Sequence, residues 1–180
     1  MSGQTAYDPA RVREQVLARL KEIGVRFEMV EHAPVHTIED CDAPAKALCA
    51  VVPKNLFLTP RNASAYHLLL IHPRAQFRTA EVSRQLDSSR LSFAPADKLM
   101  EMMRTLPGAI SPMGLLFDPE KRVRLAIDRS LLELPRLAFH PCVNTATIAM
   151  ESAEFFEKYL PAIGRQPRYV EISREEQHEI

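Results

Sequence analysis

A lysine stands immediately before an apolar run that is typical of a buried strand. Lys54 precedes Asn55-Leu56-Phe57-Leu58, so its ammonium group starts at the edge of a predicted sheet and can face a cleft or the solvent. Lysine is rarely buried without a partner, and most lysines at strand ends are solvated. The position alone leaves both alternatives open, and only the cleft-facing one carries chemistry.

A loop bounded by two glycines is the second feature that can take part in chemistry. It reads Gly108-Ala109-Ile110-Ser111-Pro112-Met113-Gly114. Glycine allows backbone N–H groups to come close to a substrate oxygen, as in an oxyanion hole. The alternative is a plain turn between a helix and a strand. Because the loop does not match the G-x-S-x-G pattern of a nucleophile elbow, Ser111 is a poor candidate for a nucleophile.

The segment His140-Pro141-Cys142-Val143-Asn144-Thr145 places an imidazole, a thiol and an amide in one short connection between two predicted strands. These groups make it a candidate wall of a site. A nucleophilic pair of His140 and Cys142 is disfavoured, because a proline separates the two residues and they need not face one another. We therefore expect the Cys142 thiol to be inert.

Two histidines, His32 and His36, have the spacing of metal ligands on a helix. Pro34 lies between them and argues against a helix there. Combining them with Cys41 or Cys49 gives none of the compact zinc-binding spacings. The sequence therefore predicts no metal site, and we expect no cofactor.

The spacing of apolar residues predicts the elements that hold these groups. Helices are expected over 9–23, from Thr37, from Thr79, from Pro95 and around 155–160, and strands over 25–29, 55–58, 66–71, 115–117, 123–127, 137–139, 145–150 and 169–172. The runs 55–58 and 66–71 are expected to form a hairpin. Helices and strands interleave without a repeat or a linker, which predicts one α+β domain, residues 1–180, around a mixed sheet. Within it, residues 1–24 hold the N-terminal helix and residues 173–180 a flexible tail.

Composition and hydropathy narrow the class of protein. A chain of 180 residues with 46% hydrophobic and 26% charged residues is typical of one globular domain. No apolar stretch is long enough to cross a membrane, the N-terminus has no secretory signal, and three cysteines make no disulfide framework. These features predict a cytoplasmic protein.

The charge is uneven along a chain whose formal net charge is zero. A neutral chain is unsuited to coating nucleic acid non-specifically. Residues 54–104, however, hold 8 basic and 4 acidic side chains, and Arg74, Arg78, Arg84 and Arg90 among them are candidate phosphate contacts. The alternative is a solvated scatter of charges that serves solubility.

Four motifs together resemble a known family. They are Lys54-Asn55-Leu56-Phe57-Leu58, Arg90-Leu91-Ser92-Phe93-Ala94, the stretch 108–115 with Ser111-Pro112, and Phe139-His140-Pro141 followed by Asn144-Thr145-Ala146-Thr147. In order and spacing, from about Val25 to Ile172, the chain resembles the YbaK-like aminoacyl-tRNA editing domains. Within them it is most similar to the free-standing prolyl-tRNA deacylases, which clear alanine from proline tRNA. Four matches in order are far more specific than any one of them.

The resemblance implies a fold and a site. The fold is α+β with a mixed, curved sheet. Catalytic roles fall to Lys54, Gly108 and His140, and substrate binding falls to Asn55, Ser111 and Asn144. Three segments depart from the usual pattern and leave the pocket size and the tRNA contacts open: Ala50-Val51-Val52-Pro53, Thr59-Pro60-Arg61 and Gly164-Arg165.

The activity that the resemblance implies is metal-independent hydrolysis of the ester between a small amino acid and a wrong tRNA, with alanine on proline tRNA as the first expectation. Lys54 would hold the terminal adenosine or its phosphate and polarise the ester, N–H groups around Gly108 would face the oxyanion, and a ribose hydroxyl would assist the attacking water. The expected partners are the acceptor end of a mischarged tRNA and, as a candidate, prolyl-tRNA synthetase, with no membrane involved. The alternatives are editing of cysteine- or serine-charged tRNA, and a non-catalytic module that binds tRNA or a synthetase.

Overall fold

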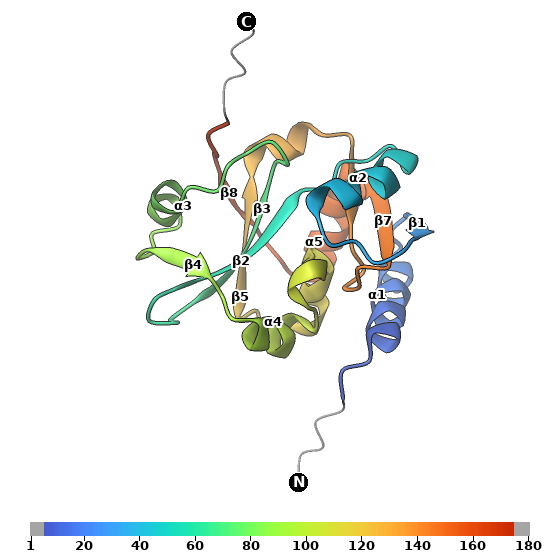
Figure 1. The fold of residues 1–180 in the computed structure, drawn as a ribbon, viewed down its shortest axis with the longest axis horizontal. Helices are drawn as coiled ribbons and strands as arrows, with labels where there is room; N and C mark the ends of the chain where they lie inside the picture. Colours follow the sequence, from blue (N-terminus) through green and yellow to red (C-terminus); the bar gives the residue numbers. More distant parts are fainter. Residues whose placement is uncertain (1–5, 175–180) are drawn as a thin grey trace, which may run out of the picture.

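A computed structural model describes residues 6–174, apart from the side chains of residues 38 and 39 (Figure 1). The helices are α1 (Pro9–Ile23), α2 (Ile38–Ala47), α3 (Thr79–Gln85), α4 (Ala96–Met103) and α5 (Leu160–Ala162), with short 3-10 helices η1 (Pro107–Ala109), η2 (Pro112–Phe117) and η3 (Arg129–Glu133) and a π-helical segment η4 (Glu154–Tyr159). The strands are β1 (Glu28–Glu31), β2 (Lys54–Pro60), β3 (Tyr66–Ile71), β4 (Leu91–Phe93), β5 (Val123–Asp128), β6 (Arg136–Phe139), β7 (Ala146–Glu151) and β8 (Arg168–Val170). This interleaved order confirms the predicted α+β class.

Helix α1 begins and ends where its sequence signals predict. The Asp8 side chain accepts hydrogen bonds from the first free N–H groups of the helix, and Pro9 occupies the first turn. Gly24 ends the helix with φ 84°, a left-handed conformation that glycine adopts without strain. Val16 and Leu20 are fully buried, so one face of α1 packs on the core.

The strands divide into two sheets. One is antiparallel in the order β1-β7-β6, and the other is mixed in the order β4-β2-β3-β5-β8, with β3, β5 and β8 parallel (Figure 1). The predicted hairpin of β2 and β3 is confirmed. The interleaved elements predicted one mixed sheet, whereas the structure has a mixed sheet and a separate antiparallel one.

Pro53 explains why the two sheets do not merge. An isolated parallel bridge joins Val51 to Leu137 of β6, with Val51 N–H donating to the Arg136 carbonyl and Ala138 N–H donating to the Val51 carbonyl. The next donor in such a ladder would be the backbone nitrogen of residue 53, and proline has no N–H group. Pairing therefore stops, and the chain continues into β2 of the other sheet.

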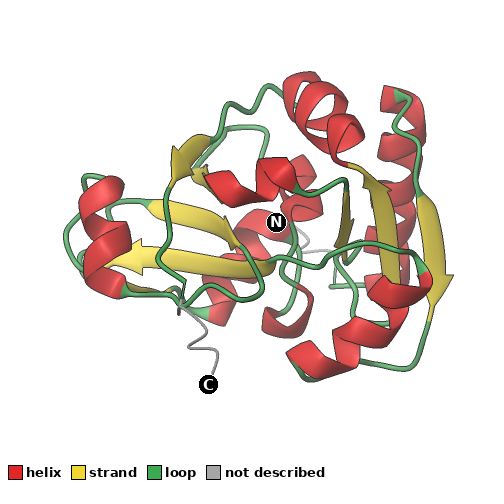
Figure 2. Ribbon diagram, turned by 90° about the horizontal axis from the view of Figure 1, so that it is seen from above, coloured by secondary structure: helices red, strands yellow, loops and turns green. Residues whose placement is uncertain are grey.

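Two hydrophobic cores lie on opposite faces of the five-stranded sheet. Phe57 and Leu68 belong to the main core, to which residues of α1 and η2 also contribute. Figure 2 shows the two groups of strands apart, with helices between them. Leu58 and Ile71 belong to a smaller core under α3. Since Lys54 pairs with Ile71, its side chain leaves the sheet on the face that α3 covers.

The run 115–117, expected as a strand, is part of the 3-10 helix η2. Pro112 fixes a helical φ in its first turn, and Gly114 allows η2 to pack against the end of α4. A Cβ on Gly114 would lie 2.9 Å from atoms of Met103, so only glycine fits there without displacing α4. Pro112 and Gly114 therefore favour a 3-10 helix over the strand that the apolar run 115–117 suggested.

The C-terminal segment contacts the domain beyond the end that the sequence predicted for its ordered part. The Ser173 hydroxyl donates to the Glu81 carboxylate of α3 at 2.6 Å, and Arg174 forms an isolated bridge with Ala75. The predicted tail 173–180 therefore begins with two residues that contact the domain. Residues 1–5 and 175–180 lie outside the described part of the chain.

Candidate functional site

Gly108 and Asn144, two predicted site residues, line the same pocket. The pocket has a volume of about 350 Å³ and is formed by the chain before α1, η1 and the segment between β6 and β7. A Cβ added to Gly108 would lie 4.0 Å from Asn144 Nδ2, so the glycine leaves open space beside the amide. Tyr7, His36 and Leu106 complete the walls, and none of these three was predicted from the sequence.

Thr105 ties the two pocket-forming loops together. Its hydroxyl lies 3.0 Å from the Ala109 carbonyl in η1 and 3.4 Å from the Cys142 carbonyl in the other loop. The side chain is fully buried, so these backbone acceptors replace water as its partners. Thr105 thereby holds the Gly108 loop at a fixed distance from the Asn144 loop. A single threonine before Pro107-Gly108 carries no sequence pattern that could have identified it.

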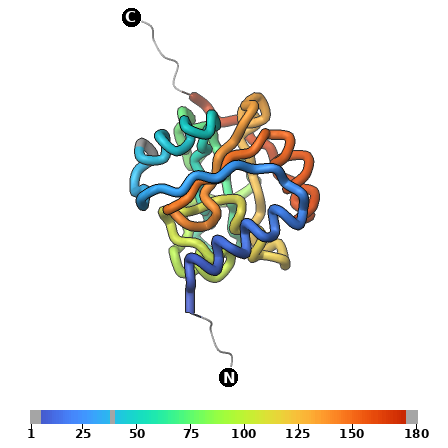
Figure 3. The backbone as a smooth tube through the Cα atoms, turned by 90° about the vertical axis from the view of Figure 1, so that its right-hand side faces the viewer, coloured from blue at the N-terminus to red at the C-terminus, as the bar shows by residue number. Residues whose placement is uncertain are grey.

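The Asn144 amide is held by the loop between β1 and α2. Asn144 Nδ2 donates to the Val35 carbonyl at 3.2 Å, and Val35 N–H donates to the Asn144 carbonyl at 3.2 Å. His32 N–H likewise donates to the Thr145 carbonyl, which extends the pairing of β1 with β7 (Figure 3). These bonds fix the rotamer of Asn144 and place His36 at the pocket rim.

His140 lies behind the pocket rather than in its wall. Its Nδ1–H donates to the Ala146 carbonyl at 3.0 Å, so the neutral ring presents an unprotonated Nε2, which lies 3.7 Å from Cys41 Sγ. Burial lowers the pKa of His140, and the neighbouring His32 lowers it further. A neutral ring at pH 7 can position the 140–145 turn and accept a proton, but it supplies no positive charge to the site.

The thiols are unsuited to nucleophilic attack. Cys142 is fully buried in the main core, and burial raises the pKa of its thiol far above the ordinary value. Burial also raises the pKa of Cys41, with Asp40 and Asp42 adding to the effect. Both groups are therefore neutral at pH 7, which agrees with the inert Cys142 expected from the sequence.

His32 is one of the two histidines whose spacing resembles that of metal ligands. Its ring nitrogens lie 2.8 Å from the Ala33 carbonyl and 2.8 Å from Thr147 Oγ1, so both are engaged within the protein. Within residues 6–174, no three His, Cys, Asp or Glu side chains gather at metal-binding distance. His36 belongs to the pocket rim instead.

Lys54 and Asn55 leave β2 on opposite faces of the sheet. The Lys54 ammonium donates to the Ala75 carbonyl at 2.9 Å, on the side of α3, and it does not line the pocket of Gly108. Asn55 Nδ2 donates to the Pro53 carbonyl at 3.2 Å, while its Oδ1 is buried and accepts no hydrogen bond from any described residue. An unpaired buried acceptor is costly, and it marks Asn55 as a group with a free bond to offer a ligand.

The start of β2 nevertheless lies at the His140 end of β6. The bridge between Val51 and Leu137 is parallel, so Lys54 and His140 each follow it by three residues in the same direction. The structure therefore groups the predicted residues in two sets. Gly108 and Asn144 share a pocket, while Lys54, Asn55 and His140 surround the junction of the sheets.

Ser111 is placed differently from the prediction. It is fully buried, and its Oγ accepts a hydrogen bond from the Met113 N–H at 3.1 Å, which caps η2. A hydroxyl enclosed in this way has no exposed surface to offer a substrate. The geometry assigns Ser111 to the shape of the Gly108 loop and not to substrate contact.

The four predicted phosphate-binding arginines are exposed around α3. Arg78 precedes the helix, Arg84 lies in its last turn, and Arg90 precedes β4, while Arg74 lies in the loop after β3. None of them forms an ion pair with another residue of the described range 6–174. Arg84 and Arg90 line one hollow of about 580 Å³, so at least these two form a common surface.

The pocket and its surroundings define a class of protein. Backbone N–H groups of a glycine loop, fixed amides and a neutral histidine, without an activated nucleophile, suit hydrolysis by a positioned water. Residues 32–158 match the family described as the aminoacyl-tRNA editing domain, and the chain belongs to this family. The resemblance predicted from the four motifs is thereby confirmed, together with the class of activity, editing of aminoacyl-tRNA.

Individual relatives agree with this assignment. The prolyl-tRNA editing protein ProX of Acetoanaerobium sticklandii is 29% identical over 160 residues, covering 89% of this chain and 97% of the relative. The prolyl-tRNA synthetase associated domain-containing protein 1 of Mus musculus is 30% identical over 162 residues, covering 88% and 95%. Among solved structures, a candidate trans-editing enzyme for prolyl tRNA synthetase has a TM-score of 0.68 at 18% identity, covering 92% of this chain and 98% of the other. This last similarity establishes the fold.

Proposed function

We propose that the protein is a trans-editing deacylase that hydrolyses alanine from mischarged proline tRNA. The family assignment supports hydrolysis of an aminoacyl-tRNA ester, and the names of the relatives support proline tRNA as the carrier. The observation that carries the proposal is the pocket between Gly108 and Asn144, whose volume of about 350 Å³ suits a small aminoacyl group next to a ribose. A separate editing step is needed because a synthetase gains only about 1–3 kcal/mol of discrimination from one methylene of difference in size between two amino acids.

The Gly108 loop supplies the oxyanion contacts in this proposal. Within η1, Pro107 has no N–H group and the Ala109 N–H donates to the Leu106 carbonyl, which leaves the Gly108 N–H as the donor at the start of this helix. An ester carbonyl bound next to Gly108 develops negative charge as water attacks, and the Gly108 N–H stabilises it. Asn144 Nδ2 faces the same space and orients the amino acid. The adjacent ribose hydroxyl assists the water, because the pocket walls hold no activated nucleophile.

Lys54 binds the terminal phosphate in this proposal, because its ammonium lies on the α3 side of the sheet. When the tRNA end binds, the Lys54 ammonium leaves the Ala75 carbonyl and donates to the phosphate instead. Asn55 offers its free Oδ1 to the terminal nucleoside, and His140 positions the turn that carries Asn144. Ser111 acts only through the shape of its loop. Arg74, Arg78, Arg84 and Arg90 contact the tRNA backbone around α3.

The proposed setting is the cytoplasm, where charged tRNA is used, with prolyl-tRNA synthetase as a partner. One group of relatives is named for association with that synthetase. No helix within residues 6–174 combines the length and the apolar character needed to cross a bilayer.

The test is a panel of mischarged tRNAs. Purified full-length protein is incubated with proline tRNA carrying alanine, cysteine or serine, and the free amino acid is measured with time. We expect alanine to be released fastest, and correctly charged prolyl-tRNA to survive because proline is larger. Faster release of cysteine or serine would reassign the substrate. Tight tRNA binding without release of any amino acid would replace the deacylase by a tRNA-binding module.

A further inference from the structure

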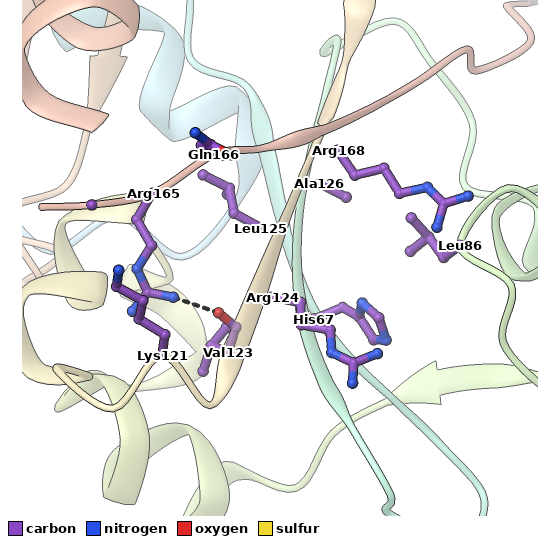
Figure 4. Close-up of a pocket in the computed structure, with 11 residues that line it drawn as sticks. His67, Leu86, Lys121, Val123, Arg124, Leu125, Ala126, Arg165, Gln166 and Arg168 are labelled. Carbon is purple, nitrogen blue, oxygen red and sulfur yellow. Dashed lines mark hydrogen bonds between the residues drawn. The ribbon is translucent and has the colours of Figure 1, made fainter. Parts of the chain in front are cut away.

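Another cavity, of about 270 Å³, lies at the end of the five-stranded sheet opposite to Lys54. Figure 4 shows the residues that line it. It is formed by β3, β5, the approach to β8 and the end of α3, and Figure 4 shows Arg124, Arg168 and His67 gathered on one side of β5. None of the pocket residues around Gly108 and Asn144 contributes to it. We call it the β5 cleft.

Positive charge dominates the β5 cleft. The Arg165 guanidinium is neutralised, since it is buried and pairs with Asp118 at 3.0 Å. Arg168 pairs with the exposed Asp87 at 2.7 Å. Within residues 6–174, Lys121 and Arg124 form no side-chain hydrogen bond or ion pair. The cleft thus holds two positive charges that no acid of the described chain balances.

A buried histidine faces these cations. His67 is only 4% exposed, it is the register partner of Arg124 in the pairing of β3 with β5, and its ring makes no hydrogen bond with any described residue. Burial lowers the pKa of His67, and Arg124 and Arg168 lower it further. A neutral imidazole at pH 7 has one N–H donor to spare. Its partner has to come from a ligand or from solvent, and beside guanidinium groups a ligand that accepts hydrogen bonds is an anion.

We propose that the β5 cleft binds a phosphate group, namely a phosphodiester of the RNA substrate. The planar guanidinium of Arg124 matches two phosphate oxygens, and His67 donates a third hydrogen bond. Lys121 lies on the other side of β5, beside Arg165, and adds positive charge at the opposite wall of the cleft (Figure 4). The apolar side chain of Leu86, at the end of α3, lies on the side of Arg124 and His67 and strengthens these contacts by excluding water. The assignment to RNA rests on the proposed deacylase function, whereas the assignment to phosphate rests on the cleft alone.

The position of the β5 cleft suits a strand whose 3′ end lies near Lys54. Leu58 of β2 pairs with His67 and is four residues from Lys54, which is about 13 Å along the same face of the sheet. Helix α3 lies between the two, with Ala75, the partner of Lys54, before its start and Leu86 of the cleft after its end. Arg84 lies in the last turn of α3, so an RNA backbone can follow positive charge from Lys54 to Arg124.

Two double variants test the proposal. Lys121→Gln with Arg124→Gln removes the unbalanced charges of the β5 cleft. Lys21→Gln with Lys46→Gln removes the same net charge from exposed positions of α1 and α2 that have no ion pair within residues 6–174 and serves as control. Binding of uncharged tRNA and KM for alanyl-tRNA(Pro) are measured at about 50 and 200 mM salt. We expect the cleft variant to bind more weakly, with a log–log salt slope flatter by about 0.7–0.9 per lost contact, an unchanged kcat, and an unaffected control.

A phosphate titration separates the sources of the anion. Inorganic phosphate is added to wild type while the ring signals of His67 are followed by NMR, with His67→Gln identifying them. A shift in wild type that the cleft variant loses, with unchanged tRNA binding, would overturn the RNA assignment in favour of a free phosphate. Equal tRNA binding in both double variants and no shift with phosphate would overturn the site. Loss of tRNA binding in a protein that releases no alanine would sink the deacylase proposal and leave the cleft assignment standing.

Discussion

Adjacent residues of one motif leave β2 on opposite faces of the sheet. The pleat of β2 sends the Lys54 ammonium toward α3 and the Asn55 amide toward the main core. A motif that reads as one catalytic unit in the sequence therefore reaches two faces of a sheet. We infer that Lys54 acts on the tRNA end from outside the pocket, while Asn55 acts at the junction of the sheets.

Replacement of Lys54 tests this division. Lys54→Ala removes a hydrogen bond to the Ala75 carbonyl, which costs about 1–3 kcal/mol of stability, so the protein stays folded. We expect kcat/KM for alanyl-tRNA(Pro) to fall by about 10- to 100-fold, because the terminal phosphate loses a hydrogen bond to a charged group, worth about 1.5–3 kcal/mol. Lys54→Arg, which keeps the charge, should retain much of the activity. Thermal unfolding and turnover of both variants are the measurements, and near-normal turnover of Lys54→Ala would remove Lys54 from the site.

At the scale of elements, a buried carboxylate joins the C-terminal helix segment to the chain entering β1. Glu154 in η4 accepts hydrogen bonds from the Arg26 N–H at 2.9 Å and from Lys158 Nζ at 3.1 Å. These donors lower the pKa of Glu154 from 4.5 to about 2. Because the folded pKa is depressed, the ionised group stabilises the fold fully above pH 4.5, and this contribution is lost as the pH falls toward 2.

A pH series of unfolding experiments checks this effect. Urea unfolding of wild type and of Glu154→Gln is compared at intervals from neutral pH to about pH 2. We expect wild type to be the more stable protein at neutral pH, and the difference in unfolding free energy to shrink between pH 4.5 and 2. A difference that stays constant over this window would show that Glu154 titrates normally.

Local signals predicted the elements well where they are strong. Asp8-Pro9 and Gly24 bound α1 in the structure as in the sequence, and the apolar runs at 55–58 and 66–71 form the expected hairpin. The separation into two sheets was not predictable, because it depends on the missing N–H of Pro53 opposite β6, a contact between segments far apart in the chain. The run 115–117 was mistaken for a strand because the packing of Gly114 against α4 is equally non-local.

The site was predictable in part. Gly108 and Asn144 follow from the family motifs, and the structure brings them into one pocket. Thr105 and Tyr7 carry no motif, since their role arises only when three distant segments meet. Ser111 is also a motif residue, and the structure shows its hydroxyl buried as the cap of η2, a contact that the motif does not reveal.

At the scale of the molecule, the proposed binding regions lie on either side of the five-stranded sheet. The pocket of Gly108 belongs to the side of the main core and the antiparallel sheet, while Lys54, the arginines around α3 and the β5 cleft belong to the other side. This arrangement suits a substrate with a small reactive end and a long anionic body. In the proposed function, the amino acid enters the pocket and the RNA backbone follows the basic side.

The most direct test of the proposed reaction site is a variant that adds one methyl group to the pocket. A Cβ on Gly108 would meet Asn144 Nδ2 at 4.0 Å, an ordinary contact, so Gly108→Ala should fold with unchanged stability. Its methyl group occupies the space assigned to the ester, and we predict that kcat/KM for alanyl-tRNA(Pro) falls by about 10- to 200-fold while the affinity for uncharged tRNA stays the same. Hydrolysis by Gly108→Ala at the wild-type rate would contradict the placement of the reaction between Gly108 and Asn144.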